Sequence, residues 1–440
     1  MEAQLSDFDP QVREDALREL VALADAGAVE LPRPDEAVNM HCHTFFSFNG
    51  YGYSPSALAW LGRKRGLAAM GIVDFDVLDG VDEFLTACDL VGLRGSAGIE
   101  TRVFVPAFAA REINSPGEPG VCYQMGLGFA SSQAEGRAAE ILADLRARAA
   151  KRNRGMMARI NAHLAPVSID YEQDVLPLTP QGNATERHML AAYAAAAGEA
   201  FPAWAEHVRF WAEKLAMAEA EVEALVDDAP AFKNVIRARL MKRGGVGYVQ
   251  PGPESFPTVD TFHEMIVRCG ALPCFAWLDG TSEGEQAIDE LLGLMIDKGA
   301  ASVNIIPDRN WNIKDPETRR AKVENLYEFV HLAQELDLPV NVGTEMNKRG
   351  LGLVDDFDAP ELEPVRQAFL DGAHFIYGHT VMERTLGLGY QSKWAADYLP
   401  SRRERNDFYT KIGYRTAPGE PRLAQLDETR SPSDLLAALE

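Results

Sequence analysis

Two histidines stand two residues apart in His41-Cys42-His43, directly after a segment over 37–40 that is predicted to be a strand. Residues two apart on a strand point to the same side, so both imidazoles would face one point. Neutral imidazole is a common ligand of transition metals. The pattern therefore predicts the first two ligands of a metal ion at a strand end, against the alternative of a chance pair of polar residues.

Three acidic residues occupy corresponding places elsewhere in the chain. Asp74 follows the predicted strand 68–73, Glu100 ends a strand that begins at Ala97, and Glu345 follows the predicted strand 338–343. Because the carboxyl ends of parallel strands share one edge of a sheet or barrel, we expect these acids to lie near the two histidines.

Strand and helix patterns alternate along most of the chain and predict an α/β fold of parallel strands with crossover helices. The remaining predicted strands are 123–130, 271–276 and 301–306, and the predicted helices are 55–65, 79–91, 258–269, 284–298 and 316–336. The predicted organisation is a helical N-terminal extension over 1–35, a barrel-type domain in two parts over 36–184 and 246–390, a helical insertion over 185–245, and a C-terminal extension over 391–440. We expect an irregular tail from 391, with a short helix from Ser431.

Composition limits the partners. The 440 residues carry a formal charge of −23, from 66 acidic and 43 basic side chains. Such a surface repels phosphate backbones and anionic lipid, so we expect no nucleic-acid or membrane binding, but a small anionic ligand remains compatible. Five cysteines without a CxxC pair predict free thiols, and no apolar run reaches the roughly 20 residues that span a bilayer. A cytoplasmic protein is expected, and its oligomeric state is not predicted.

Several motifs together resemble the PHP family, named for polymerase and histidinol phosphatase domains, over about 39–347. The family's H-x-H-[TS]-x-x-S-D-G, T-D-H-D and G-I-E motifs correspond to the segments 41–50, 73–76 and 98–100. Its R-x-H, A-H-P and D-x-H motifs correspond to 185–188, 275–277 and 345–347. The resemblance implies a distorted β/α barrel that holds up to three metals, often Zn, Mn or Fe, and that hydrolyses phosphate esters.

The resemblance implies one complete ligand set, made of His41, His43, Glu100 and Glu345. Residues that are poor ligands stand at the family's other metal positions: Gln124 and Trp277 for the second metal, and Phe48 or Asn49, Phe75 and Asn347 for the third. We therefore expect one divalent ion, Zn, Mn or Fe, in place of two or three. Asp74 would orient or deprotonate the activated water, with helix capping or support of a ligand as the alternative.

Four further residues are predicted to bind the anionic group of a substrate. Arg187 and His188 begin a helix, and Lys348 and Arg349 follow Glu345. The alternatives are a capping histidine and a solvated pair of loop charges. Glu112 and His379 are alternative metal ligands, and His379 follows a segment over 374–376 that is predicted to be strand-like.

The function expected from this sequence is metal-dependent hydrolysis of a small anionic substrate, most simply a phosphate ester. Two other hypotheses stay open: a non-catalytic ligand-binding or scaffold protein with a degenerate metal site, and a single-metal lyase or isomerase on the same fold.

Overall fold

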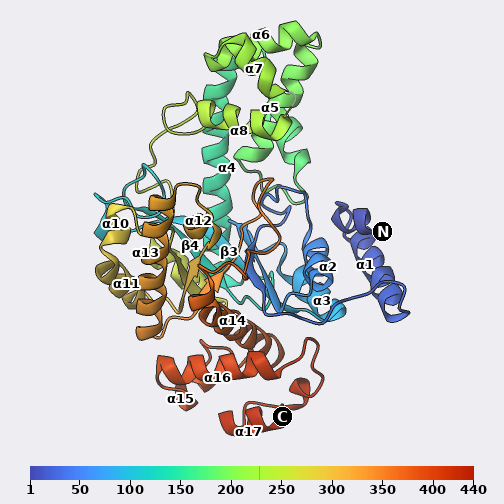
Figure 1. The fold of residues 1–440 in the computed structure, drawn as a ribbon, viewed down its shortest axis with the longest axis vertical. Helices are drawn as coiled ribbons and strands as arrows, with labels where there is room; N and C mark the ends of the chain where they lie inside the picture. Colours follow the sequence, from blue (N-terminus) through green and yellow to red (C-terminus); the bar gives the residue numbers. More distant parts are fainter. Residues whose placement is uncertain (227) are drawn as a thin grey trace. The chain divides into compact units, whose positions relative to one another are not determined.

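The computed structural model describes residues 1–226 and 228–440, and the chain divides into two compact units (Figure 1). The barrel unit comprises Met1–Phe45, Asn49–Leu142 and Pro257–Glu440. The helical unit comprises Phe46–Phe48 and Ala143–Phe256.

A seven-stranded sheet forms the centre of the barrel unit, with its strands in chain order. The strands are β1 (Val38–Cys42), β2 (Ala69–Phe75), β3 (Arg94–Phe104), β4 (Val121–Leu127), β5 (Leu272–Ala276), β6 (Ser302–Ile305) and β7 (Val340–Val342). The two edges approach each other after β1 and β7, where the His43 amide donates to the Glu345 carbonyl and the Glu345 amide donates to the His41 carbonyl, both at 2.8 Å. The sheet is therefore a nearly closed barrel, and the predicted α/β barrel is confirmed.

One strand departs from the predicted parallel arrangement. β4 runs antiparallel to both β3 and β5, whereas the other neighbouring pairs are parallel. The connection between β3 and β4, over 105–120, contains only the short 3-10 helix Pro106–Phe108 and no α-helix of the kind that usually links parallel strands, so the chain returns antiparallel.

Helices of the barrel unit lie largely where apolar periodicity predicts them. They include α1 (Pro10–Asp25), α2 (Pro55–Arg65), α3 (Val81–Val91), α9 (Val259–Arg268), α10 (Glu283–Gln286), α11 (Ile288–Asp297), α12 (Asp308–Trp311) and α13 (Pro316–Glu335). The limits of α2 match the prediction because local chemistry sets both ends. The Ser54 hydroxyl accepts from the Ala57 amide at 3.0 Å, Pro55 begins the helix, and Gly66 ends it at a φ of 84°.

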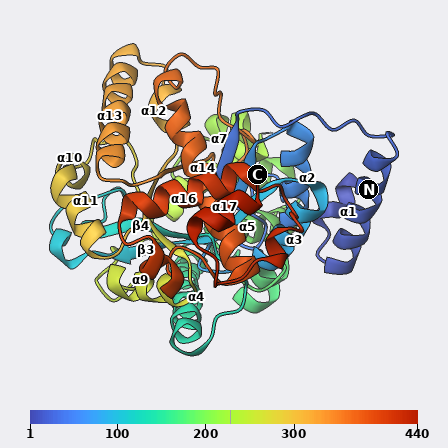
Figure 2. The same cartoon turned by 90° about the horizontal axis from the view of Figure 1, so that it is seen from below.

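The C-terminal region corrects two predictions. The segment around His374 and His379, predicted as strand-like, lies in helix α14 (Arg366–Leu386). The tail predicted to be irregular from 391 instead forms α15 (Lys393–Tyr398) and α16 (Arg402–Arg415), whereas α17 (Pro432–Ala438) matches the short helix predicted from Ser431. Figure 2 shows α14 and α16 side by side. Glycines permit this packing, since a side chain at Gly378 would meet the Tyr409 backbone and one at Gly413 would meet the His374 backbone.

Helix α14 also contacts β1, β2, β3 and β7. The Thr380 hydroxyl lies 3.1 Å from the Ser96 hydroxyl, near the start of β3. This helix therefore covers the amino-terminal end of the strands and leaves their carboxyl ends for other groups.

The helical unit has its own apolar core, in which Trp211, Tyr193 and Ile236 are buried. Its helices are the part of α4 (Gly136–Leu164) from Ala143 onward, α5 (Glu186–Ala200), α6 (Trp204–Leu215), α7 (Glu219–Val226) and α8 (Ala229–Leu240). The predicted insertion over 185–245 lies inside this unit, but the unit begins earlier, within α4. Ile160 and Leu164 of α4 join its core, and this explains the earlier boundary.

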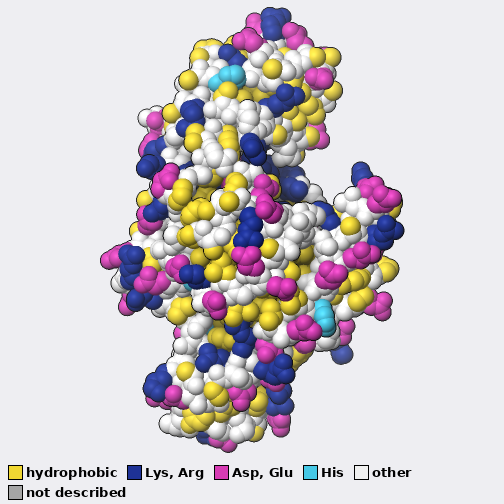
Figure 3. Space-filling view, turned by 90° about the vertical axis from the view of Figure 1, so that its left-hand side faces the viewer, with side chains coloured by type: hydrophobic (Ala, Val, Ile, Leu, Met, Phe, Trp, Pro, Cys, Tyr) yellow, Lys and Arg dark blue, Asp and Glu magenta, His cyan; other side chains and the backbone are white. Residues whose placement is uncertain are grey.

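On the face drawn in Figure 3, acidic and basic side chains are interspersed over the surface. All five cysteines are free thiols. Within residues 1–226 and 228–440, every helix is too short or too polar to cross a membrane.

Candidate metal centre

Three buried side chains meet at the carboxyl end of β1. His41 Nε2 lies 3.4 Å from Glu100 Oε2, and His43 Nε2 lies 3.2 Å from the same oxygen. The two imidazole centroids are 5.3 Å apart. We call these three residues the strand-end cluster. The i and i+2 spacing brings the histidines together, and the β2–β3 register places Glu100 opposite Phe75 at the end of β2.

Several polar atoms of the strand-end cluster lack hydrogen bonds. Among the described residues, neither His41 ring nitrogen has a hydrogen-bond partner, and the same is true of Glu100 Oε2. Buried polar groups in proteins almost always have partners, so such atoms indicate a missing ligand or ion. The short distances from Glu100 to the imidazoles are contacts without hydrogen-bond geometry.

Electrostatics keep the carboxyl group of this cluster ionised. Burial opposes the charge on Glu100, but the facing His41 and His43 outweigh it and lower the pKa of Glu100 to about 2. Burial also opposes a charge on His41, but Glu100 and Glu345 raise the pKa of its imidazole. The cluster therefore pairs an ionised carboxylate with two imidazoles in a buried place, and a divalent cation bound there would replace the proton that the carboxylates favour on His41.

The donor set fits a divalent transition metal. One ligand atom from each of His41, His43 and Glu100 can be chosen so that all lie within 4.8 Å of one another. Ligands about 2.1 Å from a tetrahedral ion are about 3.4 Å apart, close to the two distances from Glu100. Two nitrogens and one carboxylate oxygen suit Zn, Mn or Fe.

Asp74 supports the backbone beside the cluster. Its two carboxylate oxygens accept from the Thr44 amide at 2.8 Å and from the Thr44 hydroxyl at 2.6 Å. Both bonds fix the residue that follows His43. A third hydrogen bond, which does not involve Asp74, holds the same segment: the Asn49 side-chain amide donates to the His43 carbonyl at 2.8 Å. Asp74 is thus placed to hold a ligand-bearing loop, and its predicted catalytic role stays a prediction.

Glu345 lies beside the cluster, and its carboxylate faces another partner. Arg309 of α12 lies 2.8 Å from Glu345 Oε2, and Glu345 is not part of the three-residue group. The backbone there is strained, since Glu345 and Met346 have φ angles of 62° and 53°. Predicted as a fourth ligand, Glu345 is positioned next to the histidines by backbone hydrogen bonds but is held by an arginine.

The predicted substrate-binding residues fall in two places. Lys348 and Arg349 are exposed in the loop after Glu345, with the Arg349 guanidinium 6.0 Å from the Tyr51 ring centre. Arg187 and His188 belong to the helical unit. His188 caps α5, as its Nδ1 accepts from the Thr185 amide at 3.0 Å, and burial lowers its pKa to about 4.

Arg187 donates to Asn234 Oδ1 at 2.6 Å. Burial and the nearby Arg237 lower the pKa of Arg187 to about 10. The capping alternative considered for His188 thus describes its position, and both residues are packed within the helical unit.

Two side chains assigned to missing metals lie on the other side of the sheet. Gln124 Oε1 lies 3.2 Å from His263 Nε2 of α9, and the Trp277 ring stacks on Phe329 of α13 at 4.5 Å. The register explains the first, because Met125 pairs with Glu100 and shares its face, whereas Gln124 pairs with Thr101. Neither position is therefore the counterpart of a barrel-facing ligand. Phe75, by contrast, stacks on His43 at 4.2 Å.

The two alternative ligands also lie apart from the cluster. His379 is fully hydrogen-bonded within the barrel unit, since Nδ1 accepts from the Tyr390 amide at 3.0 Å and Nε2 donates to the Gly128 carbonyl at 3.1 Å. Glu112 is absent from the metal-ligand group, and its backbone carbonyl accepts from the Gly284 amide at 2.7 Å. Glu100 is the acid that the structure places with the histidines.

Sequence reasoning missed Arg309. This residue follows the carboxyl end of β6, where functional side chains of a barrel gather, so its position after the predicted strand 301–306 was an available signal. Its charge interacts with Glu345, Tyr123 and Glu100, and these contacts raise its pKa although burial opposes its charge.

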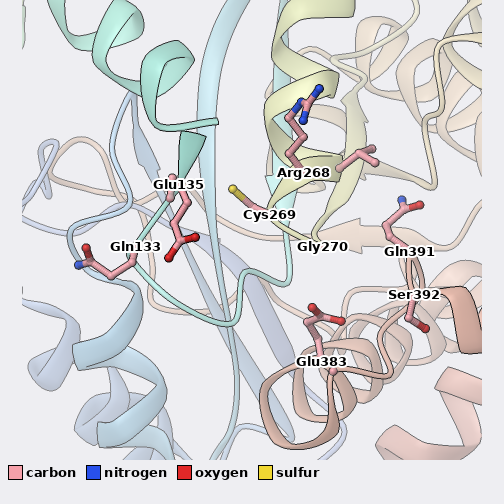
Figure 4. Close-up of a pocket in the computed structure, with 11 residues that line it drawn as sticks. Gln133, Glu135, Arg268, Cys269, Gly270, Glu383, Gln391 and Ser392 are labelled. Carbon is pink, nitrogen blue, oxygen red and sulfur yellow. The ribbon is translucent and has the colours of Figure 1, made fainter. Parts of the chain in front are cut away.

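A separate cavity of about 410 Å³ lies within the barrel unit (Figure 4). Glu135, Arg268 and Glu383 are among the residues that line it. Burial raises the pKa of Glu383, and its carboxylate accepts from the Gly389 amide at 2.9 Å. This cavity contains no residue of the strand-end cluster.

No family model and no curated protein matches the chain. A solved structure of an amidohydrolase from Chromobacterium violaceum, with sulfate bound and no metal, is similar at a TM-score of 0.51 and 16% identity, over 77% of this chain and 96% of that one. A protein from Bifidobacterium adolescentis, named as a metal-dependent phosphoesterase, matches at a TM-score of 0.47 and 20% identity, over 77% and 98%. The first likeness establishes a shared fold.

Proposed function

We propose that this protein is a PHP-like, metal-dependent hydrolase that acts on a small anionic substrate, most simply a phosphate ester. The observation that carries the proposal is the strand-end cluster, in which two imidazoles and a carboxylate converge while His41 and Glu100 keep unbonded polar atoms. The name of the fold neighbour, amidohydrolase, supports hydrolysis as the kind of reaction.

The chain's own groups supply binding and positioning. His41, His43 and Glu100 would hold one divalent ion, and Glu345 is the candidate fourth ligand. A bound Zn, Mn or Fe ion supplies Lewis acidity and lowers the pKa of a coordinated water. Asp74 orients the ligand-bearing loop through Thr44 and is the candidate proton acceptor. Lys348 and Arg349 are candidate partners for the substrate anion.

The test is metal-dependent turnover. Protein stripped of metal and reloaded with Zn²⁺ or Mn²⁺ should release phosphate from members of a phosphomonoester panel. His41→Ala and Glu345→Gln should abolish that release, while the control His331→Ala should retain it, because His331 is exposed on α13. Turnover that is unchanged in His41→Ala would overturn the proposal. Conversion of a sugar acid without hydrolysis would favour a lyase or isomerase.

A second candidate, a non-catalytic ligand-binding protein, is favoured by two contacts. Phe75 stacks on His43, and Arg309 holds the carboxylate of Glu345. Less than about 0.3 metal ion per chain, with ligand binding unchanged in His41→Ala, would favour this candidate, because a metal site of this type is saturable at one ion. We also propose a cytoplasmic location, which the five free thiols support.

A further inference from the structure

Glu345 stands between two possible partners within the barrel unit. Its backbone is hydrogen-bonded to His41 and His43, each at 2.8 Å, and its carboxylate affects the charge of the His41 imidazole. Its Oε2 is nevertheless 2.8 Å from Arg309. The Glu345 carboxylate therefore lies beside polar atoms of the strand-end cluster that lack hydrogen bonds, but it is paired with an arginine. A metal ion in the cluster and Arg309 would compete for this carboxylate.

Arg309 is a further cation beside the strand-end cluster, in addition to Lys348 and Arg349. Its side chain is 45% exposed, and its charge interacts with Glu345, Tyr123 and Glu100. A planar guanidinium binds phosphate and sulfate oxygens well, and a carboxylate paired with it competes with such an anion for its donors and its charge. The net charge of −23 repels anions from the protein as a whole, so binding of an anion at this site depends on a local positive charge.

The backbone supports an exchangeable carboxylate. Glu345 and the next residue, Met346, adopt φ angles of 62° and 53°, in a region that side chains other than glycine rarely occupy. Such strain persists where surrounding structure imposes it, and it concentrates at ligand clamps and switch regions. Here the imposed contacts are the two backbone hydrogen bonds to His41 and His43.

We propose that Glu345 is an exchange residue that couples metal binding to anion binding. Without metal, its carboxylate occupies Arg309. When the strand-end cluster holds a divalent ion, Glu345 turns to that ion, and Arg309 is free to bind the anionic group of the substrate. This exchange rests on the proposed function and adds an order of binding, in which the metal ion binds first and thereby makes Arg309 available to the anion. Because coupling is reciprocal, the anion strengthens metal binding by the same factor.

The test uses calorimetry with sulfate, which stays soluble with Zn²⁺, on the full chain. In wild type, Zn²⁺ should tighten sulfate binding by about tenfold or more, within the range usual for coupled sites. Glu345→Gln should bind sulfate tightly without metal and show no further tightening. Arg309→Met should bind sulfate weakly in both states. Arg319→Met is the matched control, since this arginine of α13 is 43% exposed and also faces a glutamate, Glu361.

Each outcome separates the two claims. Absence of saturable Zn²⁺ binding that depends on His41 and His43 would overturn the proposed function. Zn²⁺ binding that leaves sulfate affinity unchanged would overturn the exchange alone. In metal-free protein, equal sulfate affinity of Glu345→Gln and wild type would also overturn it, as would wild-type coupling in Arg309→Met. Circular dichroism of every variant identifies loss of fold.

Discussion

Two buried histidines of the barrel unit differ in how their ring nitrogens are used. His379 is completely bonded, with Nδ1 accepting from Tyr390 and Nε2 donating to Gly128. His41 is equally buried, and neither nitrogen has a hydrogen bond among the described residues. A buried imidazole with both hydrogen bonds made has a structural role, whereas a buried imidazole with unpaired nitrogens has a donor atom available to a metal ion. Burial alone therefore does not distinguish a structural histidine from a ligand.

The largest expected difference between the two histidines is in metal affinity. His41→Ala should weaken Zn²⁺ binding by about 1,000-fold or more, because even residues that merely support ligands contribute 10- to 100-fold. His379→Ala should leave the affinity within about threefold, as its side chain only bonds to the backbone. Competition with a chromophoric chelator measures both. Equal losses in the two variants would remove the distinction.

For the free energy of unfolding, substitution of His379 should have a larger effect than substitution in the strand-end cluster. His379→Ala should lower the free energy of unfolding by about 3 kcal/mol, because it leaves a cavity and an unpaired Tyr390 amide. Glu100→Gln in metal-free protein should lower it by less, because Gln fills the same volume and leaves no cavity, and the lost attraction to the two imidazoles is partly offset by the smaller cost of burying an uncharged group. Urea denaturation monitored by circular dichroism gives both values. A larger loss in Glu100→Gln would show that the cluster serves stability instead.

The pH dependence should separate His379 from the cluster. Burial lowers the pKa of His379 from 6.5 to about 4, so the folded protein favours the neutral ring. As the pH falls, His379 takes up a proton in the unfolded chain before it does so in the folded protein. The free energy of unfolding is therefore highest above about pH 6.5 and falls by about 3 kcal/mol as the pH approaches 4.

Hydrogen exchange at the Tyr390 amide, followed in metal-free wild type and His379→Gln, measures this loss. Wild type should lose protection between pH 6.5 and 4, and the variant should lose less. Parallel curves for the two proteins would contradict the assignment.

The smallest expected effect concerns Asp74. If Asp74 acts by holding Thr44, both Asp74→Asn and Thr44→Val should weaken Zn²⁺ binding by about tenfold, the usual effect of groups that support ligands. If Asp74 takes a proton, Asp74→Asn alone should abolish turnover while Zn²⁺ affinity stays near wild type. Chelator competition and phosphate release in the two variants distinguish a supporting acid from a catalytic one.

Local chemistry made much of the fold predictable. The Ser54, Pro55 and Gly66 signals gave both ends of α2, and apolar runs gave the strands near their observed positions. The segment around His374 and His379 was misread because its apolar run also suits a buried helix, which periodicity alone does not separate from a strand. Its glycines allow α16 to pack closely against α14, and this role becomes apparent only from the tertiary structure.

The parts of the site that depend on residue spacing within one strand were predictable from the sequence. The parts that depend on the pairing register between strands were less predictable. The i and i+2 spacing brings His41 and His43 to one point. The side of β4 was misjudged, because a shift of one residue moves a side chain to the other face, and Gln124 faces α9 instead. The pairing of Arg309 with Glu345 joins the segments after two different strands, and no local pattern reports it.

The most direct test is an anomalous-scattering map of crystals soaked in Zn²⁺, recorded for wild type and for His41→Ala. We predict one strong peak within bonding distance of His41, His43 and Glu100 in wild type, and its loss in the variant. A map without a peak at these residues, or a peak that survives His41→Ala, would contradict the account.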